Sequence, residues 1–156
     1  NNRDGFCCRC NNPLSGKYCD YSTGHIGNVE VYVLSGHNLR DTDGWRNDPD
    51  PYVKIEMKRW SPTGFTTDPA RTTSTDKGTR NPNWGERFAW SGFSSYNLVC
   101  FTVYDADPGS DDLLIPERCV ALSNYIGNGK MVSLYDHGHE TRYVSYFVRF
   151  EMSEGC

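Results

Sequence analysis

Alternating apolar and polar residues recur in short segments along the chain and predict β-strands. This two-residue period occurs at 29–33, 53–57, 88–90, 99–103 and 144–152. Turn-forming clusters separate these segments, for example at 81–83 (Asn-Pro-Asn) and 107–109 (Asp-Pro-Gly). No segment of ten or more residues keeps the 3.6-residue period of a helix. The pattern therefore predicts an all-β protein, an antiparallel β-sandwich.

Length, composition and charge narrow the class of protein further. A chain of 156 residues fits one domain with a small appendage. Aromatic residues make up 13% of the chain, a share that favours strands over helices. No apolar run approaches the roughly 20 residues of a membrane helix. With a net charge of −4, the chain offers no basic stripe for phosphates, so we expect no nucleic-acid partner.

Seven cysteines in so short a chain indicate an oxidising compartment, so we expect a secreted protein. The disulfide candidates are Cys7, Cys8, Cys10, Cys19, Cys100, Cys119 and Cys156. Because the number is odd, at least one thiol stays free or pairs with another chain in an intermolecular disulfide or oligomer. Two of the cysteines lie on predicted strands that flank one loop, at 100 and 119. A hairpin would place these two about opposite each other.

The first four cysteines define an N-terminal segment, residues 1–25. The spacing from Cys8 through Cys10 to Cys19 resembles the end of an epidermal-growth-factor-like module. This resemblance implies a short disulfide-stabilised cap before a main domain at 26–156. Zinc binding is the alternative for clustered cysteines, but an adjacent pair such as Cys7 and Cys8 cannot easily supply two corners of a tetrahedral site.

Eight of the thirteen aspartates fall in two short windows between predicted strands. The windows contain Asp41, Asp43, Asp48 and Asp50, and then Asp105, Asp107, Asp111 and Asp112. Turn formation explains a single Asp, but four carboxylates in one loop repel each other. Oxygen ligands gathered in loops are what Ca²⁺ requires, at about six to eight per ion. An EF-hand is excluded, because Gly44 comes two positions early and Tyr52 stands where a bidentate Glu belongs.

Three ordered motifs resemble the C2 domain, a calcium-dependent membrane-binding β-sandwich. They lie at 50–54 (Asp-Pro-Tyr-Val-Lys), 81–84 (Asn-Pro-Asn-Trp) and 103–107 (Val-Tyr-Asp-Ala-Asp). The likeness spans residues 26–152 and, within the family, extends to the C-terminal C2 domain of perforin-like pore-forming proteins. It implies an eight-stranded antiparallel sandwich in the permuted, type II order, in which an extra strand follows at the C-terminus.

The resemblance also implies ligands for two or more Ca²⁺ ions. The ligands carried over with it are Asp50, Asp105, Asp107 and Asp112. In the first acidic loop Asp43 is the carboxylate nearest to the family's ligand position, with a one-residue insertion, and Asp48 is the alternative. We expect Asp111 to serve a second or third ion.

The function that the resemblance implies is Ca²⁺-dependent binding to a phospholipid membrane surface. Five carboxylates give the loop end a charge of about −5, and two Ca²⁺ would bring it to about −1. The loop end would then tolerate anionic headgroups. We expect Trp45, at the tip of the first loop, to enter the headgroup region. Pro108 and Gly109 of the second acidic window would contact the membrane beside it.

Other functions have less support in the sequence. A stand-alone secreted matrix or adhesion protein could use the same loops on a protein or mineral surface. We expect no enzyme, because 92–96 (Gly-Phe-Ser-Ser-Tyr) lacks the last glycine of a nucleophile elbow. His137 and His139 would share one face of a strand, but no third metal ligand is near them. The insert at 60–70 is expected to be a loop.

Overall fold

The computed structural model describes residues 25–42 and 48–153, which form nine strands and one short 3₁₀ helix. The strands are β1 (Ile26–His37), β2 (Pro51–Ser61), β3 (Gly64–Thr67), β4 (Arg71–Thr72), β5 (Asn83–Ser94), β6 (Leu98–Asp105), β7 (Asp112–Ala121), β8 (Lys130–Asp136) and β9 (His139–Met152). The helix η1 (Leu122–Tyr125) lies between β7 and β8. Among the described residues, no helix has the length and apolar character that crossing a bilayer requires.

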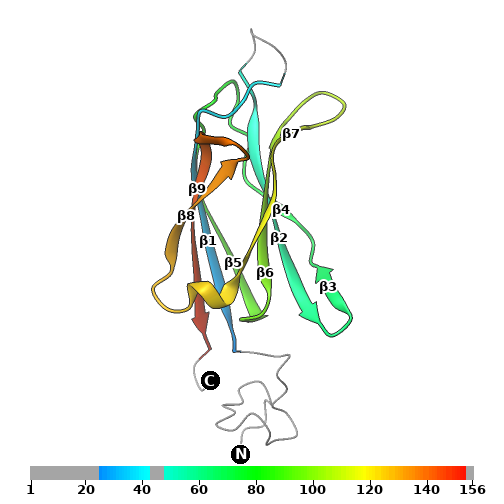
Figure 1. Ribbon diagram of the computed structural model, residues 1–156, viewed down its shortest axis with the longest axis vertical. Coiled ribbons are helices and arrows are strands. Elements are labelled where there is room, and N and C mark those ends of the chain that lie inside the picture. Colours follow the sequence, from blue (N-terminus) through cyan, green and yellow to red (C-terminus); the bar gives the residue numbers. More distant parts are fainter. Residues whose placement is uncertain (1–24, 43–47, 154–156) are drawn as a thin grey trace, which may run out of the picture.

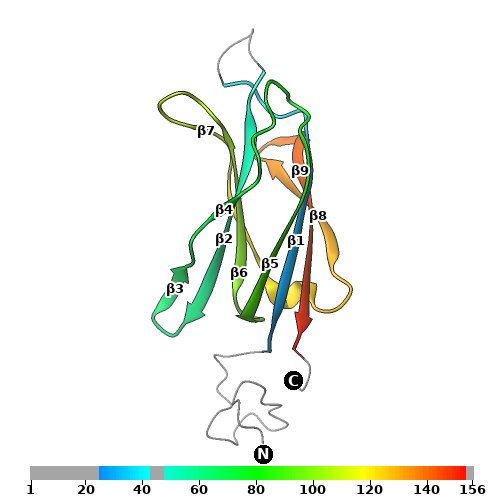
Figure 2. The same ribbon diagram turned by 180° about the vertical axis from the view of Figure 1, so that it is seen from behind.

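The strands form two sheets that face each other (Figure 1 and, from behind, Figure 2). One sheet has the order β5-β1-β9-β8, and the other has the order β3-β2-β6-β7 with β4 also paired to β2. All these strand pairs are antiparallel. The last strand, β9, lies between β1 and β8, as the permuted order requires. The predicted antiparallel β-sandwich is confirmed.

The strand count differs from the expected eight for a local reason. Both β3 and β4 pair with β2, at 58–61 and at 54–55. Between them, the Asp68 N–H donates to the Met57 carbonyl at 2.9 Å. The two short strands therefore occupy the place of one interrupted edge strand. The expected N-terminal cap, apart from His25, lies outside the described residues.

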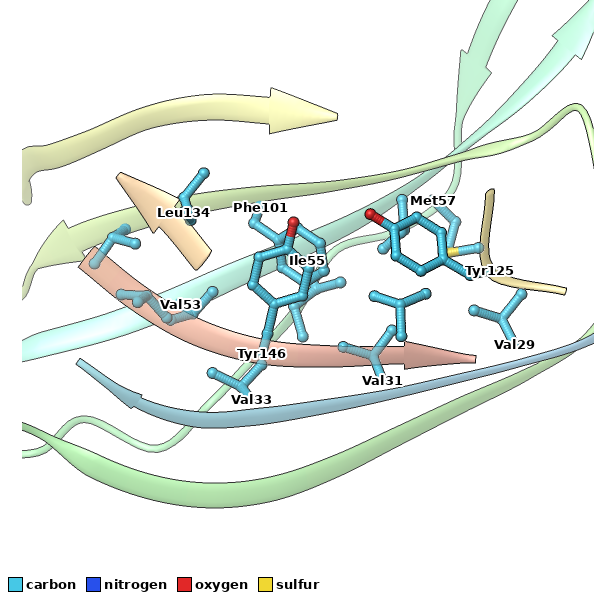
Figure 3. Packing of buried hydrophobic residues seen from close by; sticks show 14 of the residues in the cluster. Val29, Val31, Val33, Val53, Ile55, Met57, Phe101, Tyr125, Leu134 and Tyr146 are labelled. Atoms are coloured by element: carbon cyan, nitrogen blue, oxygen red, sulfur yellow. The ribbon is translucent and has the colours of Figure 1, made fainter. Parts of the chain in front are cut away.

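The alternation seen in the sequence places one side of β1, β2 and β9 in the core between the sheets. Val29, Val31 and Val33 of β1 are all buried, and they face the buried side chains of β2 across the sandwich (Figure 3). At the centre, the rings of Phe101 and Tyr146 lie 4.1 Å apart between their centroids. Burial raises the pKa of the Tyr146 hydroxyl. The two-residue period thus correctly located the core.

The insert at 60–70 is not simply a loop. It continues β2 and folds back as β3, with Trp60 opposite Phe65. Arg59 supports this hairpin, because its guanidinium pairs with Asp68 at 3.0 Å and lies over the Phe93 ring, 3.9 Å from the centroid. This ion pair and cation–π contact hold the hairpin against β5.

The expectation that two histidines share a strand face is wrong. His137 and Gly138 form the turn between β8 and β9, and His139 is the first residue of β9. Gly138 has a φ of 77°, a value that favours glycine and lets the chain reverse there. One imidazole therefore belongs to a turn residue and the other to a strand residue, so the two do not share a strand face.

A disulfide joins β6 to β7. Cys100 stands opposite Cys119 in the strand register, and their bonded sulfurs connect Cα atoms 4.0 Å apart. The predicted hairpin arrangement of these two cysteines is confirmed. Glu117 lies close to both sulfurs, but bonded sulfurs provide no thiolate for a metal. The other five cysteines lie outside the described residues.

Candidate functional site

Three loops meet at one end of the sandwich (Figures 1 and 2). They are the first loop (38–50), the second loop (73–82) and the third loop (106–111). Antiparallel pairing produces this arrangement, because Pro51 of β2 stands opposite Asp105 of β6, and Asp105 stands opposite Asp112 of β7. The first loop therefore ends beside the position where the third loop begins. We call this region the loop end.

Asp105 is the buried acid among the described residues of the loop end. The residue is 1% exposed. Its Oδ2 accepts a hydrogen bond from the Thr42 hydroxyl at 2.6 Å, and its Oδ1 accepts one from the Asp50 N–H at 2.6 Å. A buried carboxylate is tolerated only when partners of this kind satisfy its oxygens. Asp105 thus holds both stems of the first loop against the end of β6.

Asp50 connects all three loops. Its Oδ1 accepts a hydrogen bond from the Gly78 N–H of the second loop at 2.6 Å. Its carbonyl accepts one from the Ala106 N–H of the third loop at 3.0 Å. Each carboxylate oxygen has a second lone pair, so these contacts leave Asp50 and Asp105 able to bind a cation. The two acids are held in neighbouring positions by the protein itself.

The acids of the third loop differ in their surroundings. Asp111 accepts hydrogen bonds from the Tyr52 hydroxyl at 2.5 Å and from the Asp107 N–H at 3.2 Å. Burial, together with the Asp111 carboxylate, raises the pKa of Tyr52 to about 12. The hydroxyl therefore remains a donor at neutral pH. Asp107 is half-buried, and Asp112, at the start of β7, is exposed.

Arg80 of the second loop pairs with two acids of the first loop. Its Nε lies 2.9 Å from Asp48 Oδ1, and its Nη2 lies 3.2 Å from Asp41 Oδ2. The Leu39 N–H also donates to the Arg80 carbonyl at 2.9 Å. Asp48 therefore already has a cationic partner in the second loop. Asp43 itself lies outside the described residues.

The residues expected to contact a membrane are only partly described. Pro108 and Gly109 are exposed in the third loop. Leu113 adds an exposed apolar side chain next to this loop, and its carbonyl accepts a hydrogen bond from the Arg40 guanidinium. Trp45 lies outside the described residues. The described part of the loop end therefore combines acids with a small apolar edge.

The donor set fits Ca²⁺ in its chemistry. The described candidates are Asp48, Asp50, Asp105, Asp107, Asp111 and Asp112, and all are carboxylates. Hard oxygen donors suit Ca²⁺ rather than soft metals. In the described part of the chain, no three of these acids bring their oxygens within 4.8 Å of one another. Sharing one ion among three of them would therefore require the loops to approach each other.

Four residues that position the acids were missed by the sequence reasoning. They are Thr42, Tyr52, Gly78 and Arg80. Tyr52 belongs to the motif at 50–54 and could have been recognised there. The other three carry no local signal, because Thr42 and Gly78 contact acids 63 and 28 positions away. Arg80 likewise reaches Asp48 across 32 positions.

An antiparallel β-sandwich with clustered acids on two loops at one end has the architecture of a β-sandwich module that binds its ligand through its loops. The sequence model of the C2 domain matches residues 27–137. The chain therefore belongs to the C2 domain family. A comparison with curated proteins gave no match.

Solved structures share this fold at low sequence identity. The first of the C2 domains of plant Extended Synaptotagmin 1 has a TM-score of 0.67 at 21% identity, over 83% of this chain and 97% of that chain. Human GIVD cytosolic phospholipase A2 has a TM-score of 0.69 at 20% identity, over 85% of this chain and 17% of the phospholipase chain. The calcium-bound pair of C2 domains of Extended-Synaptotagmin 2 has a TM-score of 0.62 at 14% identity, over 81% of this chain and 46% of that chain. The chain thus spans only a small part of the phospholipase, and these likenesses show the fold alone.

Proposed function

We propose that this C2 domain binds phospholipid membrane surfaces in a Ca²⁺-dependent manner and performs no catalytic step. The observation that carries the proposal is the contact between Asp105 and the Asp50 backbone N–H at 2.6 Å. It holds the Asp105 carboxylate against the backbone of Asp50, a residue 55 positions away in the chain. That the structurally similar Extended-Synaptotagmin 2 domains are calcium bound supports Ca²⁺ as the cation.

We assign the role of ligand to acids of the first and third loops, for two or more ions. The proposed ligands are Asp43, with Asp48 as the alternative, and Asp50, Asp105, Asp107, Asp111 and Asp112. Bound Ca²⁺ supplies positive charge and coordination positions that phosphate oxygens can fill. Thr42 and Gly78 hold Asp105 and Asp50 in place before any ion arrives, which reduces the reorganisation that binding requires.

The proposed mechanism is an electrostatic change at the loop end. A charge of about −5, which repels an anionic membrane surface, comes from Asp50, Asp105, Asp107, Asp111 and Asp112. Two Ca²⁺ would reduce this to about −1 and permit close approach. We propose that Pro108, Gly109 and the exposed Leu113 then meet the headgroup region, together with Trp45.

Co-sedimentation with vesicles of phosphatidylcholine and phosphatidylserine tests the proposal. The chain should pellet with the vesicles in millimolar Ca²⁺ and remain in solution with EGTA. Asp105→Asn should abolish this difference. Glu151→Gln, which removes one exposed carboxylate at the opposite end of the sandwich, is the matched control and should behave as wild type. Equal binding in Ca²⁺ and EGTA would refute the proposal.

Calorimetric titration with Ca²⁺ separates the membrane function from the alternative one. A chain that binds Ca²⁺ but ignores vesicles would favour the adhesion function, in which the same loops meet a protein or mineral surface. Failure of the chain to bind Ca²⁺ would refute both the membrane function and the adhesion function.

We further propose that the protein acts outside the cytosol, as part of a perforin-like protein. The Cys100–Cys119 disulfide supports an oxidising compartment, because cytosolic thiols are kept reduced. The perforin-like assignment rests on the resemblance of the segments 71–88, 104–114 and 137–139 and on the growth-factor-like cysteine spacing that precedes the domain. Peptide mapping of the natively produced protein without reductant should recover Cys100 linked to Cys119. Recovery of both as free thiols would argue against secretion.

A further inference from the structure

A cleft lies along one side of the sandwich, between the two strands that end the sheets. β7 ends one sheet and β8 ends the other, and η1 joins these strands away from the loop end (Figure 1). The cleft has a volume of about 1100 Å³. It is lined by residues 118–120 of β7, by residues 132–140 of β8 and the turn into β9, and by Tyr146 of β9. We call it the side cleft.

The Tyr146 hydroxyl is a buried hydrogen-bond donor in this cleft. Tyr146 is 2% exposed, its ring packs against Phe101, and its hydroxyl points away from β9 (Figure 3). Within residues 25–42 and 48–153, no group forms a hydrogen bond with this hydroxyl. Because burial raises its pKa, the hydroxyl keeps its proton at neutral pH. Native proteins pair nearly all buried polar groups, so this donor indicates an acceptor that a ligand supplies.

Arg118 supplies positive charge on the β7 wall of the side cleft. Arg118 stands opposite Phe101 in the strand register, and cross-strand partners share a face of the sheet, so its side chain leaves β7 on the inner face. In the described part of the chain it has no ion pair and no hydrogen bond. The acids of the lining belong to the opposite wall. They are Asp136, which pairs with Arg142 at 3.8 Å, and the exposed Glu140.

Apolar side chains complete both walls of the side cleft. Val120 of β7 and Val132 of β8 pack against the core cluster, and Leu134 of β8 belongs to it. An alkyl chain gains free energy when it leaves water for such a surface. A guanidinium and a phenol both donate hydrogen bonds to carboxylate oxygens, and the bond from the charged guanidinium is the stronger kind. The lining therefore suits a ligand that combines an alkyl chain with one carboxylate.

We propose that the side cleft binds an amphiphilic carboxylate, an alkyl chain that ends in one carboxylate, as in a fatty acid. The Tyr146 hydroxyl and the Arg118 guanidinium donate to the carboxylate oxygens. The chain lies along the apolar side chains of β7 and β8. The site uses none of the acids of the loop end, so this binding requires no Ca²⁺ and is independent of the membrane function.

Titration of the full chain with decanoate in EGTA, followed by backbone amide chemical shifts in NMR, tests the proposal. The shifts should change at residues 118–120 and 132–136 and give a Kd. Decanol, which lacks the charge, and acetate, which lacks the chain, should bind at least tenfold more weakly. The proposal is overturned if decanol binds as tightly as decanoate, because the cleft would then adsorb any alkyl chain. It is also overturned if decanoate does not bind or if the shifts map to the loop end.

Two variants assign the carboxylate contacts. Tyr146→Phe and Arg118→Gln should each raise the Kd for decanoate at least tenfold, because each removes a donor to a charged group. The matched control is Tyr125→Phe, which removes the hydroxyl of a buried tyrosine outside the lining and should bind as wild type. Wild-type affinity in Tyr146→Phe would overturn the proposal.

Urea unfolding of the free protein shows whether the Tyr146 hydroxyl has a partner within the chain. Tyr146→Phe should be at least as stable as wild type, because it removes an unpaired buried hydroxyl and leaves the ring in place. A loss of stability would reveal a partner within the protein and would overturn the proposal.

Discussion

Removal of the Cys100–Cys119 disulfide should lower the free energy of unfolding by about 3 kcal/mol. The bond closes a loop with a sequence separation of 19, which includes the third loop. For this length the chain-entropy relation gives about 11 cal/mol/K of entropy removed from the unfolded state, or about 3 kcal/mol at 25 °C. The native state changes little, because Val99 and Phe101 keep their register partners on β7.

Urea denaturation of Cys100→Ala/Cys119→Ala against wild type measures the effect. Both proteins are unfolded in EGTA, so that metal binding does not contribute. Cys100 is buried, and its replacement by Ala also removes packing. The same comparison in a reducing agent isolates this packing contribution, because wild type then lacks the bond as well. We expect the difference between the two proteins to shrink to within about 1 kcal/mol under reduction.

Two results would refute this reasoning. One is a difference below about 1 kcal/mol under oxidising conditions, which would mean that the cross-link does not restrict the unfolded chain. The other is a full difference that persists under reduction, which would assign the loss to packing around Cys100.

Three further predictions concern the acids. The variants Asp50→Asn and Asp105→Asn should fold and lose Ca²⁺-dependent vesicle binding in co-sedimentation. Asp41→Asn, at a residue paired with Arg80, should bind vesicles as wild type does. Full vesicle binding by Asp50→Asn would contradict the proposed site. Millimolar Ca²⁺ should add roughly 1 kcal/mol, seen as a rise of a few degrees in Tm, and scans that superimpose with EGTA would contradict this. The Glu30 pKa is lowered to about 2, chiefly by the Arg87 hydrogen bond. Its charged form should therefore contribute about 1 kcal/mol above pH 4.5, lost as the pH falls toward 2. Glu30→Gln should remove that part of the acid dependence of urea unfolding.

Local patterns in the sequence located β1, β2, β5, β6 and β9 and identified the principal candidate acids. Alternation placed Val29, Val31 and Val33 inward, because successive side chains of a strand point to opposite faces of the sheet. The motifs at 50–54 and 103–107 located the start of β2 and the end of β6. They thereby brought Asp50 and Asp105 into one candidate site. These are short-range signals, and each can be recognised within a few residues.

Only the tertiary structure decided which side chains meet. The ion pair of Arg80 with Asp48 joins residues 32 positions apart, and the hydrogen bond of Thr42 to Asp105 spans 63. The insert at 60–70 became a hairpin through its pairing with β2. Contacts of this kind depend on strand register and loop closure, and a shift of one residue would send each side chain to the opposite face. A local pattern carries no information about that register, so the partners of the acids could not be predicted from the sequence.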